Sequence, residues 1–261
     1  MKKIFKISIS VMLIIFVTVN LSNISAYAAT ISRYGFSYDS SKYTVEWKVK
    51  QSIIVKSKTG AKLGTMTYVI GLAREKSGYN FLLLVKEVMT PNSQKVLIDN
   101  SNNNKKYGYG YSEYVSIKAY LPGDLENYTP QNTPKTNSTT LSMGVSASGP
   151  SISASYTINN SDLDVTAKCD TTKDMFYIVY DYIPSIINPF ASNKYVANES
   201  SQYGIAHFST EKNTSSFGFY INYEAKFGVS SNESRSPLSI YNPDVWTKGN
   251  TATYFYEFKL N

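Results

Sequence analysis

The chain has 261 residues, of which 42% are hydrophobic and 14% aromatic, with a formal charge of +7 and one cysteine, Cys169. A single cysteine excludes an intrachain disulfide, so stability must come from a packed core, which a chain of this length can form. The basic residues form no block of Lys and Arg, so the composition does not predict binding to nucleic acid.

The first 28 residues have the pattern of a secretory signal peptide. Three lysines precede an apolar run over residues 7–19, and Ala26-Tyr27-Ala28 is a small-x-small cleavage site. We expect cleavage after Ala28, which leaves residues 29–261 as a single secreted, extracellular β-rich domain. Without the three leader lysines, the 26 basic residues fall to 23 against 19 acidic ones, so this domain is only mildly basic.

The expected elements of the domain are strands. Residues 43–50 alternate apolar and polar side chains, which is the period-two pattern of a half-buried strand. The turns between such segments are rich in Asn, Ser and Gly. Further strands are expected at residues 52–56, 63–73, 79–89, 114–120, 163–167, 175–182, 203–210, 217–227 and 252–260. With no helices between them, these segments predict an all-β protein, either an antiparallel β-sandwich or an elongated β-rich fold.

Three tyrosines, Tyr107, Tyr109 and Tyr111, alternate with glycines just before the strand at 114–120. In an extended chain their rings lie on one face. An exposed row of rings can contact a sugar or a membrane interface. Alternatively, the glycines allow the rings to pack across the sheet. Residues 122–138 contain three prolines and no apolar periodicity, so they predict a linker.

Residues 139–158 predict a mid-chain amphipathic hairpin, because two alternating runs flank a Ser-Gly-Pro turn. Its apolar positions are Leu141, Met143, Val145, Ala147, Ile152, Ala154, Tyr156 and Ile158. The opposite face carries only Ser, Thr and Gly, and residues 139–161 contain no charge. Two interpretations remain open: a strand pair of a serine-rich sandwich, or a hairpin that enters a membrane with lipid on one face and water on the other.

A later loop combines apolar side chains with prolines. Ile186, Ile187 and Phe190 lie near Pro184 and Pro189, and the prolines exclude a central strand. Exposed, these side chains would form a docking patch. Folded inward, they would close one end of a sandwich.

Residues that commonly carry catalysis are sparse. His207 is the only histidine, which excludes a zinc site built from several histidines. Neither a Gly-x-Ser-x-Gly motif nor a cysteine-protease signature is present, and the four aspartates within residues 162–174 match no calcium-loop spacing. We therefore expect no cofactor, no metal site and no enzymatic activity.

Three further segments surround the hairpin. Tyr120-Leu121-Pro122 precedes it, Asn188-Pro189-Phe190 follows it, and the chain closes on an aromatic and charged strand at 254–259. In this layout, residues 114–261 resemble the leukocidin and haemolysin family of bacterial β-pore-forming toxins, which are secreted, mostly β, and carry a Gly/Ser-rich stem in mid-chain.

The resemblance implies a membrane-active protein that forms pores through the hairpin at 139–158, with homo-oligomerisation and a lipid membrane or cell surface as its partner. A membrane-spanning strand needs about 9–11 residues, a length that the arms approach when they extend to Ser138 and Asn160. The alternative is a non-catalytic extracellular or cell-wall-associated module, with a binding role through the tyrosine row or a structural role through strand edges.

Overall fold

The computed structural model describes residues 29–49, 52–76, 78–100, 105–131, 138–144, 151–157, 164–182, 199–211, 216–230 and 246–259. The predicted leader and the loop with Ile186, Ile187 and Phe190 lie outside these ranges. The described residues are mostly strands in three antiparallel sheets, which confirms the all-β class. No helix in the described ranges is long and apolar enough to cross a membrane.

The central sheet has six strands in the order β3-β5-β6-β14-β9, with β4 pairing on β5. Leu82, Leu83 and Leu84 are successive residues of β6 and all are 0% exposed. Because successive side chains point to opposite faces of a strand, this sheet must be covered on both faces. Its strands are β3 (Tyr43–Val49), β4 (Ile53–Lys56), β5 (Lys62–Glu75), β6 (Asn80–Pro91), β9 (Asp124–Thr129) and β14 (Ser200–Ser209).

The outer sheet covers one face of the central sheet and also has six strands, in the order β12-β13-β8-β15-β16 with β7 on β8. The Tyr68 and Tyr223 rings stack between the two sheets with centroids 3.9 Å apart, so the pair forms a sandwich. The strands of the outer sheet are β7 (Val96–Asp99), β8 (Lys106–Tyr120), β12 (Asp164–Ala167), β13 (Met175–Asp181), β15 (Ser216–Ser230) and β16 (Trp246–Lys259).

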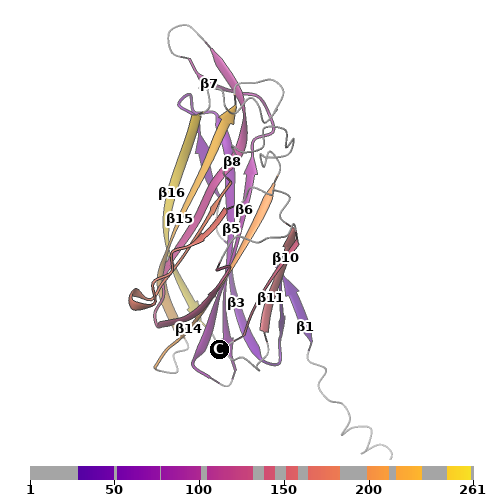
Figure 1. The fold of residues 1–261 in the computed structure, drawn as a ribbon, viewed down its shortest axis with the longest axis vertical. Coiled ribbons are helices and arrows are strands. Elements are labelled where there is room, and N and C mark those ends of the chain that lie inside the picture. The colour runs from indigo at the N-terminus through magenta and orange to yellow at the C-terminus, as the bar shows by residue number, and fades with distance from the viewer. Residues whose placement is uncertain are drawn as a thin grey trace, which may run out of the picture.

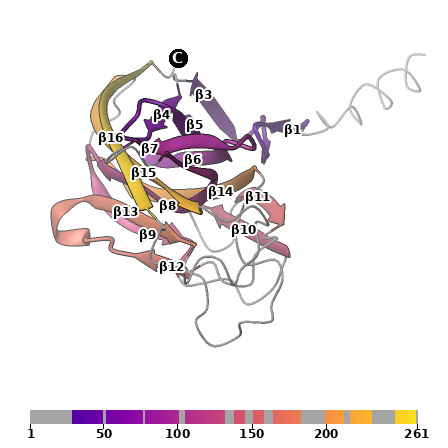
Figure 2. The same cartoon turned by 90° about the horizontal axis from the view of Figure 1, so that it is seen from above.

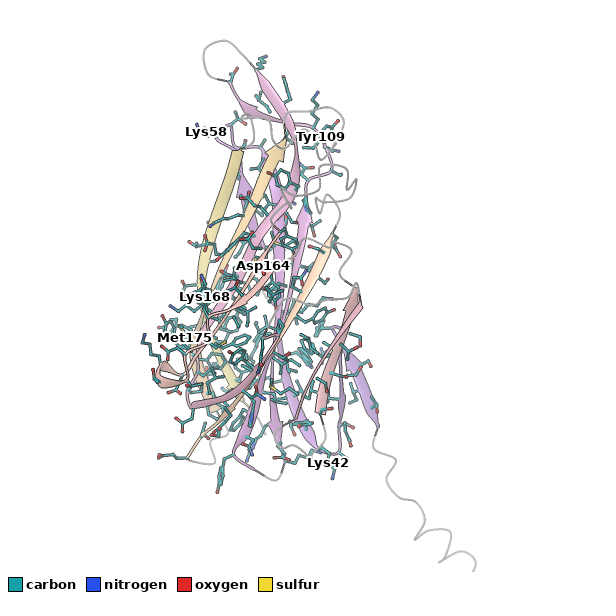
Figure 3. All side chains as sticks on the ribbon, in the orientation of Figure 1. Lys42, Lys58, Tyr109, Asp164, Lys168 and Met175 are labelled. Atoms are coloured by element: carbon teal, nitrogen blue, oxygen red, sulfur yellow. The ribbon has the colours of Figure 1, made fainter. Side chains whose placement is uncertain are left out.

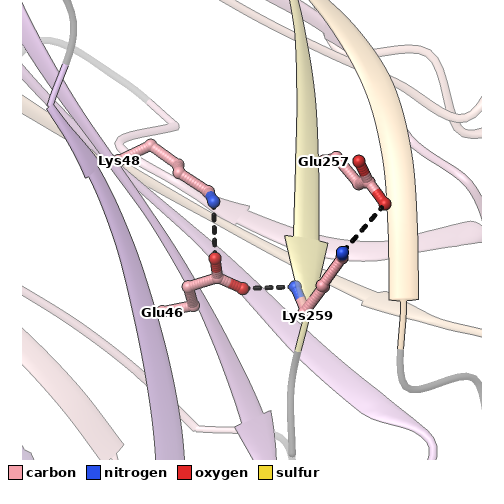
Figure 4. Close-up of polar contacts among 4 residues, drawn as sticks. All are labelled: Glu46, Lys48, Glu257 and Lys259. Atoms are coloured by element: carbon pink, nitrogen blue, oxygen red, sulfur yellow. Dashed lines mark hydrogen bonds and ion pairs between the residues drawn. The ribbon is translucent and has the colours of Figure 1, made fainter.

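Polar contacts join the two sheets at one edge of the sandwich (Figure 4). The backbone N–H of Lys259 on β16 donates a hydrogen bond to the carboxylate of Glu46 on β3. The other carboxylate oxygen of Glu46 lies 2.6 Å from Lys48 Nζ, and Lys259 Nζ lies 3.9 Å from Glu257. Both ion pairs lie within a single strand and, being exposed, contribute at most about 1 kcal/mol each, so of these three contacts only the hydrogen bond between Glu46 and Lys259 crosses from one sheet to the other.

The small sheet covers the other face of the central sheet and has four strands in the order β1-β2-β11-β10. Phe36 of β2 is 0% exposed, and its ring lies 5.7 Å from that of Trp47 and 5.3 Å from that of Tyr203. Figures 1 and 2 show β1, β10 and β11 grouped on one side of the sandwich. The strands are β1 (Thr30–Arg33), β2 (Phe36–Asp39), β10 (Ser138–Gly144) and β11 (Ser151–Thr157).

The expected linker at 122–138 is wrong for residues 124–129, which form β9. This strand pairs with β14, and its Leu125 is buried. The sequence concealed it because only one side of the strand is paired and only a few of its side chains reach the core, so the segment reads as polar. Residues 132–137 of the expected linker lie outside the described ranges.

Candidate functional site

The hairpin of β10 and β11 has the two faces that the sequence predicts. The strands pair in register from Ser138↔Thr157 to Gly144↔Ser151. On the polar face, the hydroxyls of Thr140 and Ser155 lie 2.9 Å apart, within hydrogen-bonding distance. The described apolar side chains are buried: Leu141, Met143, Ile152 and Ala154, none more than 6% exposed. Val145, Ala147, Ile158 and the side chain of Tyr156 lie outside the described part of the chain.

The hairpin lies on the face of the central sheet that points away from the outer sheet. We call this face the bed of the hairpin. β10 and β11 lie against β14, and β10 also lies against β9. On the same face of the central sheet a cross-strand row, Trp47–Gly71–Leu84–Ile205, runs over four strands, and the Trp47 ring at its end packs against Phe36 of β2. A Cβ added to Gly71 would lie 2.7 Å from the Trp47 ring, so the glycine provides the space that the indole occupies. The apolar face of the hairpin is therefore buried where β10 and β11 lie against the central sheet.

Few backbone contacts tie the hairpin to the rest of the small sheet. Within the described residues, β11 pairs with β2 at two positions, Ser153↔Ser37 and Ala154↔Phe36. β10 is the outer strand of its sheet in the described structure. Burial of one large apolar side chain contributes about 1.5–3 kcal/mol, whereas a net hydrogen bond contributes about 0.5–1.5 kcal/mol. The hairpin is therefore held chiefly by its apolar face, and another apolar environment could replace the bed.

Strand β2, to which β11 pairs, was not predicted from the sequence. Its residues Phe36-Ser37-Tyr38-Asp39 do alternate, with Phe36 and Tyr38 buried. The run is short and lies between turns at residues 34–35 and 40–42, so its strand signal is weak. The signal for β2 in the sequence was this short alternation of apolar and polar residues.

The tyrosine row on β8 does not form three exposed rings. Tyr107 is 42% exposed, but Tyr111 is only 6% exposed. A Cβ added to Gly228 would lie 2.0 Å from the Tyr111 ring, so this ring packs over the neighbouring strand β15. Tyr109 is partly exposed and lies at the same end of the molecule as Lys58, opposite Lys42 (Figure 3). A ligand-contacting role for Tyr107 and Tyr109 stays a prediction.

His207 and Cys169 have ordinary packing environments. His207 Nε2 lies 3.1 Å from Asn80 Oδ1, and burial lowers the pKa of the ring. The Cys169 thiol lies 3.7 Å from the Tyr177 carbonyl oxygen, and burial raises its pKa to about 11. A thiol with so high a pKa remains protonated near neutral pH, where the thiolate is the reactive form.

The aspartates that follow β12 cap turns. Asp170 accepts a hydrogen bond from the Thr172 N–H at 3.1 Å and caps the short 3₁₀ helix η2 (Thr171–Lys173). The hydrogen bond from the Thr172 hydroxyl is the main cause that lowers the pKa of Asp170. Asp174 accepts one from the Leu125 N–H at 3.3 Å. Among the described residues, no cluster of three or more His, Cys, Asp or Glu side chains could hold a metal ion.

The free face of the outer sheet carries a band of exposed aromatic rings. Tyr120, Tyr220 and Phe255 are 43%, 57% and 52% exposed, and the last two rings lie 5.0 Å apart. Lys118 Nζ lies 4.8 Å from the centre of the Tyr120 ring. The band was not predicted from the sequence, because its rings come from three separate strands, β8, β15 and β16.

Comparison with solved structures shows that the fold is similar to that of a bacterial toxin. The delta-toxin of Clostridium perfringens superimposes with a TM-score of 0.47 and 9% sequence identity, covering 88% of this chain and 96% of the toxin. No protein-family model matches the sequence, and no curated protein matches it.

Proposed function

We propose that this protein is a secreted, membrane-active protein that forms pores by releasing the β10–β11 hairpin from the central sheet and inserting it into a bilayer. The supporting observation is that a charge-free hairpin covers an apolar bed while only two described residue pairs join it to β2. Secretion rests on the pattern of the predicted leader.

Insertion would exchange one apolar environment for another. The buried side chains Leu141, Met143 and Ile152 would leave the central sheet for lipid, and the serine face would line water. A single inserted hairpin has two open edges, whose backbone groups lipid cannot satisfy. Several copies must therefore associate so that their strands close into a ring. Each described arm has seven residues, so the flanking residues would extend the arms to the length of about 9–11 residues that a bilayer requires.

A reversible crosslink tests the release of the hairpin. Ser37 and Ser153 are directly paired, and paired antiparallel residues have Cα atoms about 4.5–5.5 Å apart, within the range that a disulfide spans. In a Cys169→Ser background, Ser37→Cys with Ser153→Cys should release no dye from liposomes when oxidised and should regain release when reduced.

The two single-cysteine variants control for the substitutions themselves and should release dye under both conditions. Equal dye release by the oxidised and the reduced double variant would contradict the proposal. So would an absence of release by the unmodified protein from liposomes and from susceptible cells.

A second candidate function is a cell-surface or cell-wall binding module. The exposed aromatic band and the remaining surface tyrosines, Tyr107 and Tyr109, favour it, because such rings stack on sugars or other flat ligands. Retention on purified peptidoglycan or polysaccharide should then fall in Tyr107→Ala/Tyr109→Ala or in Tyr220→Ala/Phe255→Ala. A purely structural protein should instead assemble through its strand edges without lipid, which light scattering in buffer detects.

A further inference from the structure

A polar row lies inside the sandwich, where the two six-stranded sheets meet. Tyr68 on β5 pairs with Glu87 on β6, and Glu87 pairs with Gln202 on β14. The three side chains face the outer sheet, because the Tyr68 ring stacks on Tyr223 of β15. Tyr68, Glu87 and Gln202 are 0%, 1% and 3% exposed. The row therefore crosses three adjacent strands, β5, β6 and β14, in a region from which water is excluded.

The row is incompletely hydrogen bonded. Both carboxyl oxygens of Glu87 and the Oε1 atom of Gln202 are buried and have no hydrogen-bond partner among the described residues. On its other side, Gln202 Nε2 donates to the Tyr182 hydroxyl at 3.1 Å. An ionised carboxylate in this position would lack the partners that normally offset the loss of hydration. A neutral carboxylic acid is the form that this environment favours.

The titratable groups that face Glu87 are tyrosines. Tyr68 faces it from β5 and Tyr223 from β15, and the Tyr223 hydroxyl lies 3.1 Å from that of Tyr256 on β16. Tyr182, which follows β13, reaches the row through Gln202. Burial raises the pKa of Tyr223 well above its usual value, so this phenol stays neutral. Burial alone raises the pKa of Glu87 to about 8, with no contribution from a nearby cation in the described structure.

We propose that the Tyr68–Glu87–Gln202 row is a proton-dependent lock between the two six-stranded sheets, closed when Glu87 is neutral and loosened when it ionises. β6 and β14 also carry Leu84 and Ile205 on their opposite faces, beneath the small sheet. Loosening at Glu87 therefore acts on the strands that support the hairpin. The lock is a property of the soluble protein and does not depend on pore formation.

The sign of the pH dependence follows from the raised pKa. The folded state binds the Glu87 proton up to about pH 8, whereas the unfolded chain releases it near the ordinary value of 4.5. Stability from this group is complete below the ordinary value and falls as the pH rises toward 8. Between these limits, the unfolding equilibrium constant of the natural protein should rise about a thousandfold or more relative to that of Glu87→Gln.

Denaturant unfolding of both proteins from pH 4.5 to 8.5 measures this ratio. Gln has the shape of the neutral acid, so the variant should fold and should lose the pH dependence that Glu87 causes. Glu257→Gln, at an exposed carboxyl of the outer sheet, is the matched control and should retain that dependence. Parallel curves for the natural protein and Glu87→Gln, or a natural protein that gains stability relative to the variant as the pH rises, would overturn the proposal.

A spectroscopic measurement tests the protonation state directly. The infrared difference spectrum between the natural protein and Glu87→Gln at pH 6 should contain the carbonyl stretch of a protonated carboxylic acid, which should disappear above pH 8. If the spectrum shows only a carboxylate at pH 6, Glu87 is ionised in the closed sandwich and the lock does not exist.

Discussion

The attachment of the hairpin can be tested by removing one side chain from the buried face of β11. Ile152 is 0% exposed and pairs with Met143 on β10. Ile152→Ala would leave a cavity between the hairpin and the central sheet, and a truncation of this kind costs about 2–5 kcal/mol. Because only two described residue pairs join β11 to β2, we expect the loss to weaken the hairpin layer before it weakens the sandwich.

Amide hydrogen exchange, resolved by segment, distinguishes local from global loss. A cost of about 2 kcal/mol corresponds to roughly thirtyfold faster exchange in a unit that opens by itself. This acceleration should appear in β10 and β11 and should be much smaller in β8 and β15. Ile31→Ala is the control, because Ile31 belongs to the same sheet but is 38% exposed.

Two results would refute this reasoning. Equal acceleration in β8, β15 and the hairpin would show that the small sheet and the sandwich unfold together. Equal effects of Ile152→Ala and Ile31→Ala would show that the apolar face of the hairpin does not hold it in place.

Two other predictions concern the core. In Gly64→Ala, the new Cβ would lie 2.3 Å from the Phe227 ring of the opposite sheet, so denaturant unfolding should show that the free energy of unfolding falls by about 1–3 kcal/mol. Gly249→Ala is the control and should lower it by less, because the nearest neighbour of its Cβ is the flexible Lys226 stem at 3.1 Å. Burial lowers the pKa of His207, so the contribution of this residue to stability falls as the pH drops below its usual value of 6.5. In thermal melts, the melting temperature of His207→Gln should therefore decrease less than that of the natural protein as the pH is lowered.

The strands with long alternating or apolar runs were predictable from sequence, because their patterns repeat over enough residues. Residues 63–73 and 217–227 were predicted and lie within β5 and β15. The four-residue strands β1, β2 and β7 were not predicted, whereas β4 and β12, of the same length, lie within the expected strands at 52–56 and 163–167, so short strands were predictable only in some places. Which strands pair with each other could not be predicted from the sequence either. Strand β11, for example, pairs with β2, more than a hundred residues away in the chain.

The two faces of the hairpin were predictable, but the environment of its apolar face was not. A period-two pattern records only that alternate side chains avoid water, and lipid and a protein bed meet this condition equally well. Whether lipid or protein covers the apolar face depends on residues of other strands. Trp47, Leu84 and Ile205, on the covered face of the central sheet, belong to three such strands. Glu87 presents the same difficulty, since its sequence neighbours do not reveal that the opposing sheet excludes water from it.

The Tyr68–Glu87–Gln202 row and the surface under the hairpin both include residues of β14. Alternate side chains of this strand point toward the outer sheet and toward the small sheet. Gln202 points into the sandwich beside Glu87, whereas Tyr203 and Ile205 lie under the small sheet. A strand cannot move one set of side chains without moving the other, because both sets share one backbone. A negative charge placed beside Gln202 must therefore disturb the bed on which the hairpin rests. We therefore expect protonation of Glu87 inside the sandwich and attachment of the hairpin outside it to be coupled through β14, although Glu87 and the hairpin lie on opposite sides of the central sheet.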